Sequence, residues 1–143
     1  MLLRRRSQKV DLLKKVPLFS DLSKRHLNEI AKHADEAKMR EGTVFAKQGR
    51  TGTEFVFIVD GKAQVEKDGK VIRRISAGDF FGEISMIDGE PRTATVTAET
   101  DGTLLVVNSR SFNHLLDTIP GLRKKIMVSL CKYLRRAEGG ENR

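Results

Sequence analysis

The chain has 143 residues, of which 38% are hydrophobic and 32% charged, a balance typical of one globular domain with its own core. Its single cysteine, Cys131, excludes an internal disulfide framework and a cysteine-rich metal centre, and we expect the thiol to be buried or half-buried in a helix. No apolar run approaches the roughly 18 residues of a membrane span, and Met1-Leu2-Leu3 before three arginines is not a signal peptide, so a cytoplasmic protein is expected.

The formal net charge of +8 is concentrated at the two ends of the chain. Residues 1–15 and residues 120–143 each carry +5, whereas the 104 residues between them carry −2. Solvated helix faces, or contact with an acidic partner, explain such terminal charge as well as nucleic acid does. Nucleic-acid binding is therefore kept as an alternative and is not the expected function.

The first predicted element is a short helix over Gln8–Lys15, which Val16-Pro17 ends. We treat residues 1–15 as a basic N-terminal helical segment, residues 16–136 as one domain and residues 137–143 as a polar tail.

A second helix is predicted to run to about Ala34, with Ser20 or Ser23 as its N-cap. Its apolar face has helical spacing and comprises Leu27, Ile30, Ala31 and Ala34. His26 and His33 lie among charged residues with nothing in the sequence to pair them with other ligands, so we expect both to be solvated.

From Ala37 to Val107 the hydrophobic period changes to two, which is typical of strands. The predicted strands are Thr43–Lys47, Phe55–Asp60, Lys62–Lys67, Lys70–Ile75, Thr93–Ala98 and Thr103–Asn108. Asp60-Gly61, Asp68-Gly69 and Asp101-Gly102 lie between successive strands and favour tight hairpins. Many short strands with close turns predict a mainly-β sandwich or barrel.

Residues 80–87 offer the beginning of an anion site. Phe80-Phe81 is an apolar strand end, and Gly82 lets the backbone turn sharply or approach a ligand closely. Glu83–Ile87 contains no Gly or Pro and could form one helical turn, whose first N–H groups attract anions.

Asp88-Gly89 and Pro91 end this turn, and Arg92 follows just before the strand at Thr93–Ala98. The stretch therefore combines a glycine turn, a helix N-terminus, the Glu83 carboxylate and the Arg92 guanidinium. A ligand that carries a phosphate and a free hydroxyl would use all four.

This stretch resembles the phosphate-binding cassette of cyclic nucleotide-binding domains, such as those of protein kinase A regulatory subunits, cyclic nucleotide-gated channels and the bacterial catabolite activator protein. The matching residues are Phe81-Gly82-Glu83-Ile84-Ser85-Met86 and Pro91-Arg92-Thr93-Ala94-Thr95-Val96, with Met86 where the family usually has Leu. The glycines at 42, 49, 61 and 78 also match, so the resemblance covers about residues 16–135. It implies an eight-stranded jelly-roll β-barrel with N-terminal helices and C-terminal hinge and lid helices.

The resemblance also implies residue roles. Glu83 would accept a hydrogen bond from the ribose 2′-OH, and Arg92 would hold the cyclic phosphate. The other cassette residues expected at the ligand are Phe81, Gly82, Ile84, Ser85 and Thr93. The ligand would be cyclic AMP or cyclic GMP, with cyclic AMP favoured and no metal required. Such a module would regulate an effector domain or protein.

Two C-terminal helices are predicted after the strands. Ser109 can cap the first, which ends near Asp117, and Pro120 suits the first turn of the second. The second has an apolar stripe at helical spacing, formed by Leu122, Ile126, Leu130, Tyr133 and Leu134. By resemblance these are the hinge and lid helices. The outer turns of the second helix carry Arg123, Tyr133, Arg135 and Arg136, any of which could contact the base. Of these, Arg123 and Tyr133 are included among the expected site residues.

A metal-dependent cupin-like barrel enzyme is the competing class. It would need clustered His and carboxylate ligands on barrel strands. His26, His33 and His114 all lie outside the predicted strands, and no catalytic triad can be argued. We therefore expect a regulatory binding module and no enzyme.

Overall fold

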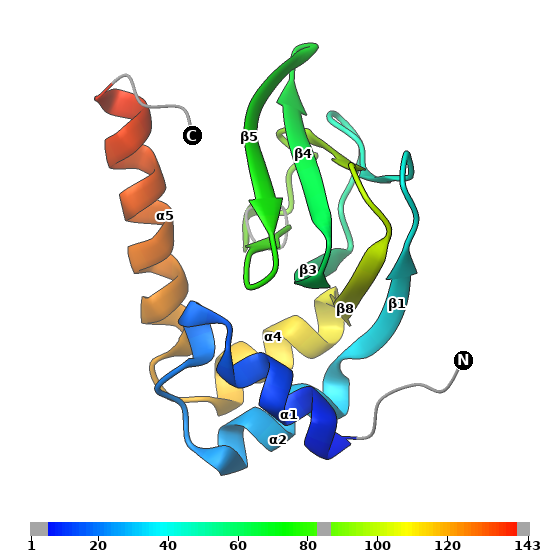
Figure 1. Cartoon of the computed structure of the whole chain (residues 1–143). Coiled ribbons are helices and arrows are strands. Elements are labelled where there is room, and N and C mark those ends of the chain that lie inside the picture. Colours follow the sequence, from blue (N-terminus) through cyan, green and yellow to red (C-terminus); the bar gives the residue numbers. More distant parts are fainter. Residues whose placement is uncertain (1–5, 83–86, 140–143) are drawn as a thin grey trace.

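The structure is a computed structural model that describes residues 6–82 and 87–139 (Figure 1). Its helices are α1 (Arg6–Lys14), η1 (Pro17–Phe19), α2 (Lys24–His33), α4 (Ser109–Thr118) and α5 (Leu122–Glu138). Its strands are β1 (Asp35–Met39), β2 (Val44–Ala46), β3 (Glu54–Asp60), β4 (Lys62–Lys67), β5 (Lys70–Ser76), β6 (Phe80–Phe81), β7 (Thr95–Ala98) and β8 (Gly102–Asn108).

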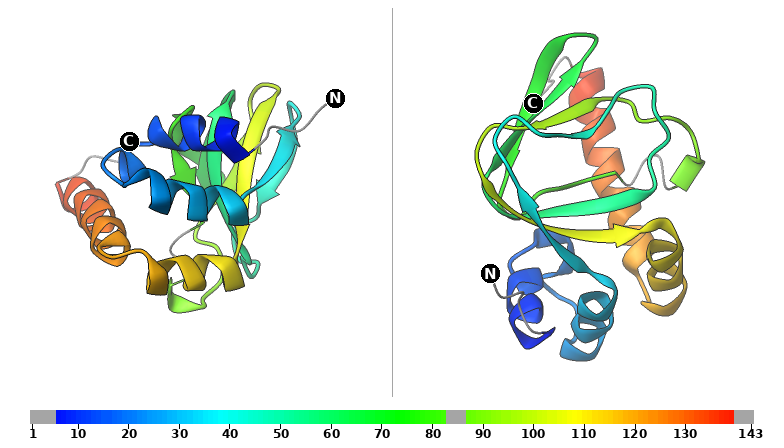
Figure 2. Two further views of the ribbon diagram at one scale, coloured as in Figure 1. Left: turned by 90° about the horizontal axis from the view of Figure 1, so that it is seen from below. Right: turned by 90° about the vertical axis from the view of Figure 1, so that its right-hand side faces the viewer.

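The strands form two four-stranded antiparallel sheets, ordered β1-β8-β3-β6 and β2-β7-β4-β5. Helices α1, α2 and α4 gather at one end of the sheets, whereas α5 stands along the side, next to β5 (Figures 1 and 2). The predicted mainly-β fold, with eight strands and flanking helices, is confirmed. None of the helices in the described part of the chain is long and apolar enough to cross a membrane.

Strands β3 and β8 are buried on both faces, which explains their continuous apolar runs. Phe55, Phe57, Leu105 and Val107 pack against the helices, whereas the residues between them in sequence face the second sheet. Strand β4 has one buried face and accordingly alternates between apolar and polar residues.

The helices share one core with the first sheet. Val10 and Leu13 of α1 are buried in the same cluster as Phe19, Leu27 and Phe112, so α1 packs with the helices that follow it. Phe55 is the centre of an aromatic group within this core, and its ring centroid lies 4.6 Å from that of Phe57, 5.4 Å from that of Phe80 and 4.7 Å from that of Phe112. This group joins β3 to β6 and α4.

Only one of the three predicted Asp-Gly hairpins is found. Asp68 and Gly69 have φ of 52° and 82° and join the paired strands β4 and β5. The other two predictions are wrong, because β3 and β4, like β7 and β8, belong to different sheets. The chain turns a corner there, and a Cβ on Gly102 would lie 2.0 Å from the Asp60 carbonyl oxygen. These glycines permit close backbone approach at the corner.

The N-terminus of α2 agrees with the prediction, whereas the N-termini of α4 and α5 differ from it by one or two residues. Ser23 caps α2 as expected, since its hydroxyl accepts from the His26 N–H. The cap of α4 is Asn108 and not Ser109, because the amide oxygen of Asn108 accepts from the Ser111 N–H at 2.8 Å. Helix α5 begins at Leu122, after Gly121, and so excludes Pro120.

Helix α5 is fixed at its start and less covered toward its end. Leu122 and Ile126 are buried in the helical core, but Leu134, which we expected in the buried stripe, is 59% exposed. Cys131 is also exposed, so the expectation of a buried or half-buried thiol is wrong. The helix turns this residue away from the cluster that holds Ile126.

An ion pair between Lys125 of α5 and Asp21 ties the helix to the segment before α2. The hydrogen bond from the Lys125 ammonium, together with its charge, lowers the pKa of Asp21. A carboxyl with a lowered pKa favours the folded state only while it is ionised. This tie is therefore expected to weaken as the pH falls through the folded-state pKa of Asp21.

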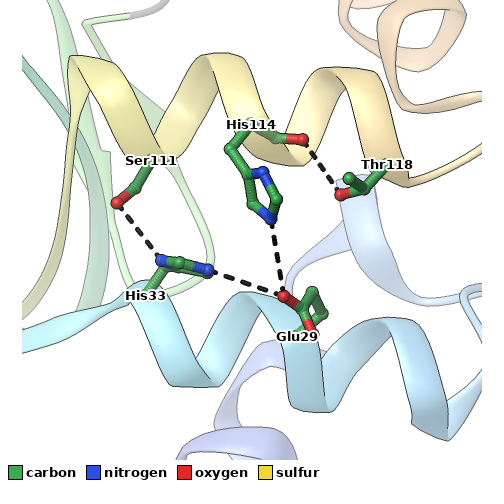
Figure 3. A network of polar contacts seen from close by, with 5 residues as sticks. All are labelled: Glu29, His33, Ser111, His114 and Thr118. Carbon is green, nitrogen blue, oxygen red and sulfur yellow. Dashed lines mark hydrogen bonds and ion pairs between the residues drawn. The ribbon is translucent and has the colours of Figure 1, made fainter.

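The expectation of solvated histidines without partners is wrong for His33. Helices α2 and α4 lie side by side and bring His33 and His114 together, with ring centroids 5.2 Å apart, next to Glu29 (Figure 3). The separation of His33 and His114 in sequence hid this contact.

Candidate ligand-binding site

A cavity of about 340 Å³ lies between the second sheet and α5. Its wall is formed by residues of both sheets and by one face of α5. The chain segments before residue 83 and after residue 86 also contribute. The lining residues are Ala46, Val65, Lys67, Ile72, Arg73, Asp79, Phe80, Phe81, Gly82, Arg92, Thr93, Ala94, Val96, Ser129, Leu130, Tyr133 and Arg136.

The backbone of Arg92 is fixed on both sides by the loop that follows β2. Its N–H donates to the Arg50 carbonyl at 2.8 Å, and its carbonyl accepts from the Gly49 N–H at 2.9 Å. Thr51 and Pro91 form a β-bridge alongside. These bonds place the Arg92 side chain at the cavity independently of any ligand.

The Arg92 guanidinium runs between two glycines. One of its terminal nitrogens, Nη2, donates to the Glu54 carbonyl at 3.1 Å. A Cβ on Gly52 would lie 2.2 Å from Arg92 Nε, and a Cβ on Gly82 would lie 2.7 Å from Arg92 Nη1 and 2.4 Å from the Glu54 carbonyl oxygen. Gly82 also has a φ of 102°, which only glycine adopts readily. Both glycines are therefore needed for this position of the guanidinium.

Gly52→Ala is expected to displace the Arg92 side chain without straining the backbone of residue 52. The φ of Gly52 is not positive, so alanine is not strained there, and only the Arg92 side chain has to move. We expect ligand affinity to fall by about ten- to a hundredfold, the equivalent of a lost charged hydrogen bond, and the free energy of unfolding to change by less than about 1 kcal/mol.

Calorimetric titration with ligand and urea denaturation measure the two quantities. The matched control is the same substitution in an Arg92→Ala background, where it should cause no further loss of affinity. A further loss there would show that Gly52 does not act through Arg92.

The cavity has a basic wall. Lys67, Arg73 and Arg136 line it together with Arg92, against one lining carboxylate, Asp79, among the described residues. Such a wall attracts an anionic ligand. The described part of the chain gives the buried Nε of Arg73 no hydrogen-bond partner, and the Arg73 guanidinium carbon lies 5.7 Å from the centroid of the Tyr133 ring, in the range of a cation–π contact. This contact joins β5 to the outer half of α5.

The cavity brings together five of the residues that we predicted for the site. They are Phe81, Gly82, Arg92, Thr93 and Tyr133.

Three others, Glu83, Ile84 and Ser85, lie outside the described residues, as does most of the helical turn expected over Glu83–Ile87.

Arg123 does not reach the cavity. Its guanidinium donates to the Leu116 carbonyl at 3.1 Å and pairs with Asp117, so it joins α5 to α4. The ligand contact predicted for Arg123 has no support in this geometry.

Sequence analysis missed Gly52 and Arg73. Gly52 lies in the loop between β2 and β3, and Arg73 lies in β5 next to a second arginine. Arg74, which is exposed and pairs with Glu99, cannot be told from Arg73 by residue type. Alternation along β5 places Arg73 on the same face as the buried Ile75, and the strand pairing sets Arg73 opposite the buried Val65.

Comparison with known proteins identifies the family of this chain. The family model described as "Cyclic nucleotide-binding domain" matches residues 36–119, more than half of the chain. The chain therefore belongs to the cyclic nucleotide-binding domain family, and it is a cyclic nucleotide-binding regulatory domain.

Two protein kinases or kinase subunits are among the proteins similar to it in sequence. The cAMP-dependent protein kinase regulatory subunit of Schizosaccharomyces pombe is 38% identical over 106 residues, which cover 73% of this chain and 26% of that protein. The cGMP-dependent protein kinase egl-4 of Caenorhabditis briggsae is 33% identical over 127 residues, covering 84% and 17%. The chain thus spans about a quarter of the length of the first relative and less than a fifth of the length of the second.

Solved structures agree with this assignment. The structure of cAMP-bound PfPKA-R (141-441) matches with a TM-score of 0.85 and 26% sequence identity, over 95% of this chain and 48% of that one. The predicted membership of the cyclic nucleotide-binding domain family is confirmed.

Proposed function

We propose that this domain binds cyclic AMP in the cavity between the second sheet and α5, and that binding regulates an effector. The observation that carries the proposal is the Arg92 guanidinium, which two glycines and the Glu54 carbonyl hold at a basic cavity of about 340 Å³. A planar, permanently charged group in that position suits the two exocyclic oxygens of a cyclic phosphate.

The rest of the ligand is assigned by the same logic. Glu83 accepts a hydrogen bond from the ribose 2′-OH, and the backbone N–H groups of Ile84 and Ser85 donate to the phosphate, with Gly82 allowing the close approach. Thr93 lies beside Arg92 on the cavity wall and contacts the phosphate or the base.

Tyr133 covers the base from α5. Its ring lines the cavity and is already in contact with Arg73, so a purine would find an aromatic face and a guanidinium at the same place. Cyclic AMP is the favoured ligand because the similar solved structure holds cAMP and the S. pombe relative is cAMP-dependent. Cyclic GMP stays a second ligand, since the C. briggsae relative is cGMP-dependent.

Titration calorimetry with cyclic AMP, cyclic GMP and 5′-AMP tests the proposal. We expect one cyclic AMP per chain at micromolar affinity or better, cyclic GMP equal or weaker, and 5′-AMP much weaker, because a linear phosphate has another shape and charge. No heat and no thermal shift with millimolar cyclic AMP would refute it.

Helix α5 acts as a lid that closes over the ligand. A ligand that binds more tightly to the closed arrangement shifts the population toward it. We expect deletion of residues 128–143 to leave the fold intact, because Leu122, Lys125 and Ile126 keep their contacts. The deletion removes Leu130, Tyr133 and Arg136 from the cavity, so affinity for cyclic AMP should fall by about tenfold or more, since a cation–π or stacking contact to the base is worth ~1–2 kcal/mol.

The measurements are calorimetry for the affinity and circular dichroism for the fold. A substitution of the exposed Leu134 by alanine is the matched control, because it alters α5 without touching the cavity. Full affinity and unchanged selectivity in the deletion variant would show that α5 only packs and does not act as a lid.

We further propose that the domain has no catalytic activity of its own and that its partner is an effector domain or protein. The group that could hold a metal ion among the described residues lies between α2 and α4 and not on the barrel strands, which argues against a cupin-like centre. The basic residues at the ends of the chain do not make nucleic acid the favoured partner. The division into residues 1–15, 16–136 and 137–143 stays a prediction.

A further inference from the structure

Three side chains with metal-ligating atoms converge between α2 and α4, away from the ligand cavity (Figure 3). Glu29 and His33 are four residues apart on α2 and therefore share one face of the helix, and His114 reaches them from α4. One ligand atom from each residue lies within 4.8 Å of the others.

The spacing within this group is too long for direct hydrogen bonds. Glu29 Oε1 lies 3.5 Å from His33 Nε2 and 3.7 Å from His114 Nε2, whereas a normal N–H···O bond is about 2.7–3.2 Å. Two ligands bound tetrahedrally to one ion at about 2.1 Å are roughly 3.4 Å apart. The two distances from Glu29 Oε1 match the edge of such a tetrahedron better than they match a hydrogen bond, and the ligand atoms of the two histidines lie within 4.8 Å of each other.

His33 is also held in the orientation that a ligand needs. Its other ring nitrogen, Nδ1, lies 3.2 Å from the Ser111 hydroxyl, which comes from α4. With the proton on Nδ1 donated to Ser111, the lone pair of Nε2 faces Glu29. Histidine ligands of metals usually make such a second hydrogen bond, which fixes the tautomer and the ring orientation.

We propose that Glu29, His33 and His114 bind a divalent transition-metal ion, with Zn²⁺ as the best fit, and that the ion joins α2 to α4. Two imidazoles and one carboxylate suit Zn²⁺, whereas Mg²⁺ and Ca²⁺ prefer oxygen ligands alone. The three side chains are 28%, 36% and 48% exposed for His33, Glu29 and His114, so an ion can reach them. A water molecule completes the coordination, as in other three-ligand zinc sites.

The test is calorimetric titration of the full, untagged chain with ZnCl₂. The exposed Cys131 could bind zinc by itself, so all measurements use a Cys131→Ser background. We expect one Zn²⁺ per chain and a higher melting temperature, because an ion that binds only the folded state stabilises it. Titration with Co²⁺ should give the visible absorption bands of a four- or five-coordinate nitrogen and oxygen site.

Single substitutions locate the ion. His33→Ala, His114→Ala and Glu29→Gln should each lower the Zn²⁺ affinity by more than about a hundredfold, a larger loss than outer-shell changes cause. His26→Ala is the matched control, since His26 lies on the same helix but outside the group, and it should bind like the background.

Ser111 provides a finer test of a positioning role. Ser111→Ala should lower the affinity by about ten- to a hundredfold, the range for an outer-shell partner, while the Asn108 cap keeps its bond to the backbone of residue 111.

Two results would overturn the proposal. One is the absence of stoichiometric zinc binding at micromolar concentrations. The other is zinc binding that keeps its full affinity in the His33→Ala and His114→Ala variants, whatever the result for His26→Ala. In either case Glu29, His33 and His114 are not a zinc site and only join α2 to α4 through their side-chain contacts. A cyclic nucleotide is absent from these titrations, so their outcome does not depend on the function proposed above.

Discussion

Arg92→Ala is expected to weaken cyclic AMP binding by about 2–5 kcal/mol, which corresponds to a loss of roughly thirty- to several thousandfold in affinity. The phosphate would then enter the cavity without the group that is positioned to neutralise it. Arg92→Lys should also lose affinity, because a point charge cannot reproduce two parallel hydrogen bonds. The fold should stay intact, since the backbone bonds of residue 92 to Arg50 and Gly49 do not involve the side chain.

Calorimetry with cyclic AMP measures this effect. Arg74→Ala is the matched control, because Arg74 is an exposed arginine on β5 that pairs with Glu99 and does not line the cavity. It removes one positive charge without touching the ligand. Wild-type affinity in Arg92→Ala would show that the phosphate binds somewhere else.

Phe55→Ala is expected to lower the free energy of unfolding by about 3–5 kcal/mol, the usual cost of removing a buried phenylalanine side chain. Phe55 is 3% exposed and its ring contacts those of Phe57, Phe80 and Phe112, so truncation leaves a cavity where β3, β6 and α4 meet. The result should be a large shift of the urea midpoint without a new intermediate.

The control for this variant is Val71→Ala, on the exposed side of β5, which should change the free energy of unfolding by less than about 0.5 kcal/mol. Similar values for the two variants in urea denaturation would contradict the assignment of Phe55 to the centre of the core.

Local patterns predicted the secondary structure well, because helix faces and alternating strands leave a direct trace in residue order. The six strand ranges read from the pattern correspond to β2, β3, β4, β5, β7 and β8, with ends that differ by up to two residues. Asp60-Gly61 and Asp101-Gly102 were misread as hairpins, since the same dipeptide also serves a corner where the chain changes sheets.

Phe81, Gly82, Arg92 and Thr93 could be assigned to one place because they lie close together in sequence, whereas the parts of the cavity supplied from a distance could not. Gly52 packs on Arg92 from forty residues away, and its role follows only from the close approach in space. The group of Glu29, His33 and His114 was missed for the same reason, because the strands β1 to β8 separate α2 from α4 in sequence. The contact of Arg123 with α4 could not be predicted, because the helical pattern does not say which face of α5 meets α4.

A crystal structure of the domain with cyclic AMP tests the central claim most directly. We predict one nucleotide in the cavity, with its phosphate on the Arg92 guanidinium, its 2′-OH on Glu83 and its base against Tyr133. A nucleotide bound elsewhere on the domain, or a phosphate that makes no contact with Arg92, would contradict this account.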